Sequence, residues 1–234
     1  FAIVDFPEAI LPVKPILFWV IDKLSMIDIL LIDQWKTNKL ELILNWKLII
    51  WVLKLNWFDK DDTNIIPEGF YFSGISAGLK DSQKKDLGLI LAPENSICTG
   101  LFTQSTVRAA CVDLCEQRIS KTGNLIRAIL INSGHANACT GDFGLRDSLK
   151  ATSELAQLLG LNDDQVLICS TGIIGVPIPI SNLISNLPVL VDKLSNSNSR
   201  DTAEAILTTD LTIKRSLIET EIEGRRIKIL GIAK

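Results

Sequence analysis

A short glycine-bearing motif that follows an apolar run constrains the fold most. Residues 166–169 read VLIC and residues 170–175 read STGIIG. A short apolar run of this kind predicts a buried strand, and the motif predicts that the strand ends there in a turn. Glycine permits positive φ and lets a ligand approach the backbone closely. A hydroxyl beside an exposed backbone N–H could donate to a developing oxyanion, although a structural turn between strand and loop accounts for the same residues.

Composition and charge argue against several classes of function. The 234 residues carry a net charge of −3, which predicts no nucleic-acid partner. The five cysteines form no CxxC pair and His135 is the single histidine, so we expect no metal site. Scattered cysteines of this kind are typical of free thiols in a reducing compartment, here the cytoplasm. The sequence has neither a P-loop nor a GxGxxG motif, and we expect no cofactor.

Neither the histidine nor the cysteine nearest the motif is a strong candidate for catalysis. His135 has no evident partners for a catalytic triad, and we interpret it as a loop residue rather than a general base. Cys169 belongs to an apolar strand, where thiols are usually inert.

Two segments of different composition meet near residue 64. All five tryptophans lie before residue 58, whereas all fourteen glycines and all five cysteines lie from Gly69 onward. We therefore predict an unrelated or poorly specified extension at 1–64 and a folded domain at 65–234. Charges interrupt each apolar run of the extension before the roughly 18 residues typical of a transmembrane helix, and no signal peptide is evident. Residues 40–53 have the apolar density of a helix. A membrane-surface segment, a helical extension and read-through of upstream DNA all remain open.

From residue 65 the pattern predicts an α/β domain. The expected strands cover residues 70–78, 87–93, 96–102, 127–132 and 166–169, and a hairpin joins 217–223 to 226–232. The expected helices cover residues 142–159, 180–194 and 201–207, the second of them broken or kinked by Pro188. Residues 103–117 are interpreted as a loop followed by a strand or helical turn.

The first of these helices has an apolar stripe and a clear end. Its leucines at 145, 149, 155, 158 and 159 lie on or near one face. Gly160 is placed to end the helix at its C-cap.

Five motifs follow one another from residue 69 onward. After the stretch at 69–92, residues 132–141 read NSGHANACTG, residues 170–175 STGIIG, residues 208–210 TTD and residues 231–234 GIAK. In this order they resemble the ornithine acetyltransferase family, also called the bifunctional glutamate N-acetyltransferase family of arginine biosynthesis, whose signatures are NSGNANACTG and STGVIG. The resemblance covers residues 65–234 and leaves out the first 64.

The resemblance implies a fold and a set of site residues. The family fold is a layered α/β sandwich similar to the N-terminal-nucleophile hydrolases, of which residues 65–234 would be an incomplete part. The family's oxyanion hole corresponds to Thr171 and Gly172. Its substrate contacts correspond to Thr209, or Thr208 if the register differs by one, and to Lys234.

The resemblance also implies a reaction and partners. Family members transfer an acetyl group from N-acetylornithine to glutamate, and bifunctional members also use acetyl-CoA. The precursor cleaves itself before a threonine in an ATML motif, and the resulting α and β chains form a hetero-oligomer. That threonine attacks the acetyl group with its own N-terminal amine as base, which would explain why no histidine base is needed.

Two departures from the family pattern limit what the resemblance implies. The given residues end at Lys234, before any ATML motif, so they contain no nucleophile threonine, and His135 replaces the usual asparagine or glutamine. We expect this polypeptide alone to be inactive as an acetyltransferase, and to aggregate or depend on a partner chain because strand edges would be exposed. The alternatives are an inactive gene remnant and a related N-terminal-nucleophile aminopeptidase.

Overall fold

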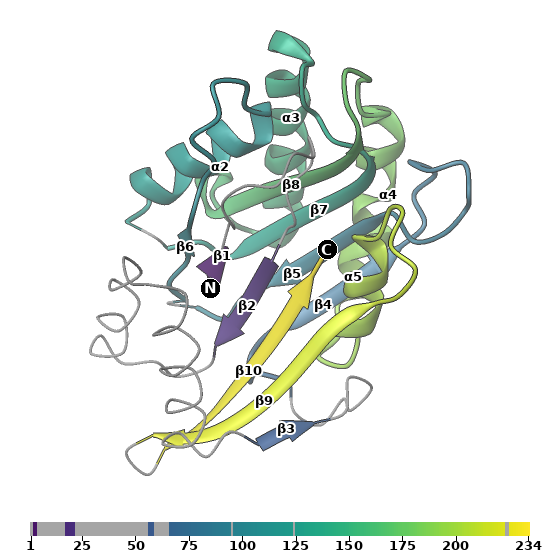
Figure 1. The fold of residues 1–234 in the computed structure, drawn as a ribbon. Coiled ribbons are helices and arrows are strands. Elements are labelled where there is room, and N and C mark those ends of the chain that lie inside the picture. Colours follow the sequence, from purple (N-terminus) through teal and green to yellow (C-terminus); the bar gives the residue numbers. More distant parts are fainter. Residues whose placement is uncertain are drawn as a thin grey trace, which may run out of the picture.

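The computed structural model describes residues 2–3, 17–21, 56–58, 66–94, 96–123, 125–222 and 225–234. Two β-sheets and a set of helices make up this part of the chain (Figure 1). The apolar helix expected at 40–53 lies outside the described residues. Within them, no helix has both the length and the apolar content needed to cross a bilayer.

The first sheet has four strands in the order β4-β5-β7-β8. The strands are β4 (Tyr71–Ile75), β5 (Leu87–Leu91), β7 (Ala128–His135) and β8 (Val166–Ile173). β5 pairs antiparallel with both β4 and β7, whereas β7 and β8 run parallel. The expected strands at 70–78, 87–93 and 127–132 are therefore confirmed, with β7 reaching three residues further along the chain.

The second sheet contains the predicted hairpin near its edge. Its order is β3-β9-β10-β2-β1-β6, and β9 and β10 pair from Lys214↔Ala233 to Ile222↔Arg225. The expected strand at 96–102 is reduced to the short β6. Three short strands of the segment 1–64 join this sheet, and the division of the chain at residue 64 stays a prediction. The bounds are β1 (Ala2–Ile3), β2 (Leu17–Ile21), β3 (Asn56–Phe58), β6 (Thr99–Gly100), β9 (Lys214–Ile222) and β10 (Arg225–Ala233).

Alternation along β7 sends neighbouring side chains into two cores. Ile129 and Ile131 pack with Leu230 of β10 between the two sheets. Leu130, which points to the opposite face, packs with Leu155 under the helices. Burying one such side chain contributes about 1.5–3 kcal/mol. The result is a layered α/β sandwich of sheet, sheet and helices, which confirms the predicted fold class.

The helices agree with the prediction only in part. They are α2 (Ala110–Lys121), α3 (Gly141–Leu159), α4 (Ile180–Asp192) and α5 (Ser199–Ala205), with a 3₁₀ turn η2 at Asp163–Gln165. The strand or helical turn expected within 103–117 is a helix of 12 residues. α4 continues through Pro188. α5 begins at Ser199 rather than Asp201, and its N-cap Asn198 makes no side-chain cap.

The leucine stripe expected on α3 is confirmed only in part. Leu155 is fully buried and Leu159 half-buried, whereas Leu145, Leu149 and Leu158 are 41%, 42% and 46% exposed. The buried face is mostly small, and consists of Gly144, Ser148, Ala151, Thr152, Leu155 and Ala156. Small side chains let α3 pack closely against α2 and α4. The C-cap was predicted correctly, since Gly160 ends α3 at a φ of 66°.

Candidate functional site

The STG motif lies inside β8 and not in a turn after it. The predicted end of the strand at Cys169 is therefore wrong, because β8 continues to Ile173 along its parallel partner β7. In that pairing Ser133 lies opposite Thr171, and Gly134 opposite Gly172. The Asn-Ser-Gly-His motif and the STG motif thus occupy adjacent positions at the same end of two neighbouring strands.

The two glycines allow an unusually close contact between these strands. Gly134 and Gly172 have φ angles of 111° and 134°, which side-chain-bearing residues rarely adopt. A Cβ atom on Gly172 would lie 2.2 Å from the carbonyl carbon of Gly134. The register also shifts at His135, which pairs with both Thr171 and Ile173. Irregularities of this kind re-aim side chains and occur often next to active sites.

The Thr171 hydroxyl is buried beside the contact between the two glycines. Thr171 is only 1% exposed. Its Oγ1 atom has no hydrogen-bond partner among the residues that the structure describes. Leaving a buried hydroxyl unpaired costs about 1–3 kcal/mol, and native proteins satisfy most such groups. The hydroxyl is therefore available to a group that enters the site.

Side-chain hydrogen bonds brace the strand ends around Thr171. The Ser170 hydroxyl donates to Oδ1 of Asn132 over 2.6 Å, and Nδ2 of Asn132 donates to the His135 carbonyl over 2.9 Å. His135 is half-buried as the last residue of β7, so its interpretation as a loop residue is wrong. Burial lowers the pKa of its imidazole, partly offset by the charge of Asp81. Nδ1 of His135 also lacks a partner in the described part of the chain.

Residues 136–140 form a loop that leads from β7 into α3 and is held by side-chain hydrogen bonds. Asn137 adopts a φ of 51° and is 1% exposed. Its Nδ2 donates to the Gly144 carbonyl over 3.0 Å and to the Ser148 hydroxyl over 2.8 Å, and its Oδ1 accepts from Thr140 over 2.8 Å. A Cβ atom on Gly144 would lie 2.1 Å from the Thr140 hydroxyl. Glycine in the first turn of α3 is thus explained by the packing of this loop.

A loop between β4 and β5 packs on the other side of Gly134. A Cβ on Gly134 would lie 2.7 Å from the Leu79 carbonyl oxygen and 3.0 Å from Cγ of Lys80. The Lys80 ammonium donates to the carbonyl of Leu207 over 2.9 Å. Leu207 immediately precedes the TTD motif. Lys80 therefore connects the STG region to that motif.

The TTD and GIAK motifs meet through an ion pair. Nζ of Lys234 lies 3.4 Å from Oδ2 of Asp210, and both side chains are 11% exposed. Lys214 donates to the other oxygen of Asp210. Burial raises the pKa of Asp210, but the Lys214 hydrogen bond and the charge of Lys234 outweigh it and hold this pKa below its ordinary value. Thr209 is exposed and Thr208 is half-buried.

The nearby thiol has the environment expected of an inert cysteine. Its neighbour Cys115 and burial together raise the pKa of Cys169 well above its ordinary value. Cys115 itself donates to the Ile168 carbonyl over 3.2 Å. A neutral thiol in such a place is a poor nucleophile.

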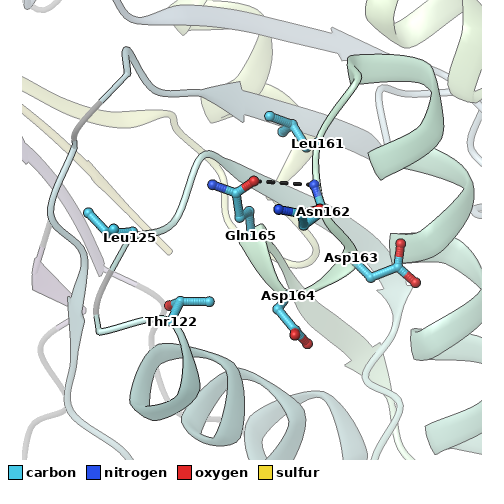
Figure 2. Close-up of a pocket in the computed structure, with 7 residues that line it drawn as sticks. All are labelled: Thr122, Leu125, Leu161, Asn162, Asp163, Asp164 and Gln165. Atoms are coloured by element: carbon cyan, nitrogen blue, oxygen red, sulfur yellow. Dashed lines mark hydrogen bonds between the residues drawn. The ribbon is translucent and has the colours of Figure 1, made fainter.

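One surface hollow of the described residues lies away from the motif residues. Figure 2 shows it beside the hydrogen bond from the Asn162 amide to Gln165, at the Val166 end of β8 and thus at the opposite end from Thr171. It has a volume of ≈ 610 Å³ and is lined by Thr122, Leu125, Leu161, Asn162, Asp163, Asp164 and Gln165. A smaller hollow of ≈ 390 Å³ borders the TTD segment through Leu207 and Leu211.

A series of contacts connects the motifs. Gly172 lies against Gly134, Lys80 connects Gly134 to Leu207, and Asp210 joins the TTD segment to Lys234. The roles of Thr171, Gly172, Thr208, Thr209 and Lys234 stay predictions. Sequence reasoning missed Lys80 and Asp210 as parts of this arrangement. The available signal was their location, since both lie in the stretches that carried the family resemblance.

Comparisons with known proteins point to one family. A family model described as the ArgJ family matches residues 71–234. The arginine biosynthesis bifunctional protein ArgJ of Prochlorococcus marinus subsp. pastoris is 67% identical over 168 residues, which cover 72% of this chain and 42% of that protein. The protein of the same name from Parasynechococcus marenigrum is 57% identical, with coverages of 72% and 41%. This chain spans about two fifths of the length of the curated relatives it matches.

Solved structures show the same likeness. The crystal structure of ArgJ from Bacillus halodurans superimposes with a TM-score of 0.70 and 28% identity, over 77% of this chain and 92% of that chain. The ornithine acetyltransferase of Mycobacterium tuberculosis, in complex with ornithine, gives a TM-score of 0.68 and 27% identity, over 77% and 94%.

Proposed function

Because this chain belongs to the ArgJ family, we propose that residues 65–234 supply the oxyanion-stabilising and substrate-binding part of an acetyl-transfer site. The reaction would move the acetyl group of N-acetylornithine to glutamate in arginine biosynthesis, in the cytoplasm. The observation that supports this most directly is Thr171, whose hydroxyl is buried without a partner among the described residues at the point where the two motif-bearing strands meet.

The chemistry follows from where negative charge develops. Attack on the acetyl carbonyl converts its oxygen into an oxyanion. The Thr171 hydroxyl and the Gly172 backbone N–H would donate to that oxygen. Donors placed in advance in a buried site need no reorganisation during the reaction, and removing one such donor typically lowers kcat by about 10²- to 10³-fold.

The TTD and GIAK motifs would bind the substrate. N-acetylornithine and glutamate both carry an α-carboxylate, for which the Lys234 ammonium is a suitable partner. Asp210 keeps this ammonium near the TTD segment. Because Lys214 also bonds Asp210, Lys234 can turn to a substrate carboxylate without leaving Asp210 unpaired. Thr209, which is exposed, would supply a hydroxyl contact, with Thr208 as the alternative.

The attacking group would come from a partner β segment. A threonine at the start of that segment would transfer its hydroxyl proton to its own amine as it attacks the acetyl carbon. The ornithine amine leaves with a proton, and the glutamate amine then takes the acetyl group from the threonine. Acetyl-CoA would replace N-acetylornithine as donor in a bifunctional enzyme. The α and β chains would together form the working hetero-oligomer.

Reconstitution tests the proposal. The full chain would be co-expressed with the β segment of the Prochlorococcus relative, and acetyl transfer from N-acetylornithine to glutamate measured. We expect Thr171→Val to lower kcat by about 10²-fold or more, and Thr171→Ser, which keeps the hydroxyl, to retain most activity.

Three results would count against the proposal. A co-purified pair that transfers no acetyl group would favour an inactive remnant, and release of N-terminal residues from peptides instead would favour an aminopeptidase. Equal activity of Thr171→Val and wild type would remove Thr171 from the oxyanion hole.

A further inference from the structure

The Lys80 side chain spans the two halves of the candidate site, the Gly134–Gly172 contact and the TTD segment. Its stem crosses Gly134, with Cγ 3.0 Å from the place a Cβ would take there. Its ammonium reaches the Leu207 carbonyl, 127 positions away in sequence, over 2.9 Å. Gly134 in turn lies against Gly172. The Lys80 side chain therefore contacts both Gly134, which lies behind the proposed oxyanion hole, and Leu207, which precedes Thr208.

A buried carboxylate holds the loop that carries Lys80. Asp86 is fully buried and its two oxygens accept three backbone N–H groups, from Ala77 over 2.6 Å, Leu79 over 2.7 Å and Lys80 over 3.0 Å. The backbone carbonyl of Asp86 accepts the N–H of Ser133 on β7 over 2.9 Å. The loop is thus fastened to the same strand that carries Gly134, so the base of the Lys80 side chain is fixed relative to the site.

We propose that Lys80 is a positioning residue, which holds the Leu207 carbonyl and thereby places the 208–210 segment against the Gly134–Gly172 contact. Its role in substrate binding rests on the function proposed above, whereas its hold on the segment does not. An ammonium–carbonyl bond in this half-buried place is stronger than one on an open surface, because fewer waters compete for the donor. Burial contributes little to holding this segment, because Thr209 is exposed and the neighbouring Leu211 is 100% exposed.

The first test measures the segment itself. In the full chain, Lys80→Met keeps the stem over Gly134 and removes the donor, whereas Lys80→Arg keeps a donor. Lys84→Met, an exposed lysine of the same loop, is the matched control. We expect hydrogen exchange at the amides of 207–210 to rise about tenfold in Lys80→Met, and to stay near wild type in Lys80→Arg and Lys84→Met. Unchanged exchange at β7 amides would show that the fold is intact.

The second test asks whether the placement matters for function. The same variants would be paired with the β segment. Calorimetry would measure N-acetylornithine binding, and the acetyl-transfer assay would give KM and kcat. We expect Lys80→Met to weaken binding and raise KM about tenfold with a smaller change in kcat, and Lys80→Arg to recover most of the affinity.

The outcomes separate the two proposals. Exchange at 207–210 that is equal in wild type and Lys80→Met overturns the positioning role. Faster exchange with unchanged affinity overturns the role of Lys80 in substrate binding and supports its hold on the segment. If the wild-type pair does not bind N-acetylornithine at all, the proposed function fails, while the exchange result still decides whether Lys80 positions the segment.

Discussion

Gly172 lies directly against the backbone of Gly134, so closely that a Cβ atom on Gly172 would meet the Gly134 carbonyl carbon at 2.2 Å. The contact brings the ends of β7 and β8 together and leaves the neighbouring Thr171 buried. The two family motifs thus meet through their glycines, and the hydroxyl of the threonine between Ser170 and Gly172 has no hydrogen-bond partner among the described residues.

Replacing Gly172 with alanine should destabilise the protein strongly. Alanine would have to adopt a φ of 134° and would also push into the Gly134 backbone. We expect a loss of about 3 kcal/mol or more in the free energy of unfolding, measured by chemical denaturation. Gly160→Ala is the matched control, because Gly160 also has positive φ but nothing lies within 4 Å of its Cβ position. Its expected loss is about 1–2 kcal/mol, and equal losses would contradict the steric explanation.

Asp86→Asn should loosen the loop that carries Lys80. Asparagine keeps the size of the side chain but replaces one of two acceptor oxygens with a donor, which would face backbone N–H groups. Hydrogen bonds to a charged group contribute about 1.5–3 kcal/mol each, so we expect a loss of at least that amount on denaturation. Asp81→Asn changes an exposed carboxylate of the same loop and should leave stability nearly unchanged. A comparable loss in both variants would argue against the bonding role of Asp86.

The stability contributed by Asp210 should depend on pH in the acid range. Its folded pKa lies below the ordinary value of 3.8, so the unfolded chain takes up the proton first as pH falls. The contribution is therefore complete above that value and is lost as pH falls through the folded pKa. The difference in unfolding free energy between wild type and Asp210→Asn should be constant near neutrality and shrink below about pH 4. A difference that grows on acidification would reverse the sign of this prediction.

Thiol labelling should single out Cys139. Cys139 is exposed, whereas burial raises the pKa of Cys98 and of Cys111 to about 12. At about pH 8 the folded protein should therefore react rapidly at one thiol, and at all five after unfolding. Mass spectrometry of the labelled peptides identifies the site, and Cys139→Ser should abolish the rapid phase. Rapid labelling of Cys169 in the folded state would contradict its inert environment.

The sequence by itself determined most strands of the first sheet, the β9–β10 hairpin and the family. Alternation in β7 is enough to divide Ile129 and Leu130 between two cores, because successive side chains on a strand point to opposite faces. Gly160 marked the end of α3, and the residues around Gly224 marked the β9–β10 hairpin. These features depend on neighbours close in the chain, so local patterns reveal them.

Only the tertiary structure decided how the motifs are arranged. Local pattern ended β8 at Cys169, but the parallel partner β7 supplies the backbone hydrogen bonds that carry it to Ile173. Leucines suggested one face for α3, yet packing against α2 and α4 selected the face of small residues. The Lys80–Leu207 bond joins residues 127 positions apart. Contacts of this kind leave no trace in local periodicity, because they form only when the layers pack and bring distant segments together.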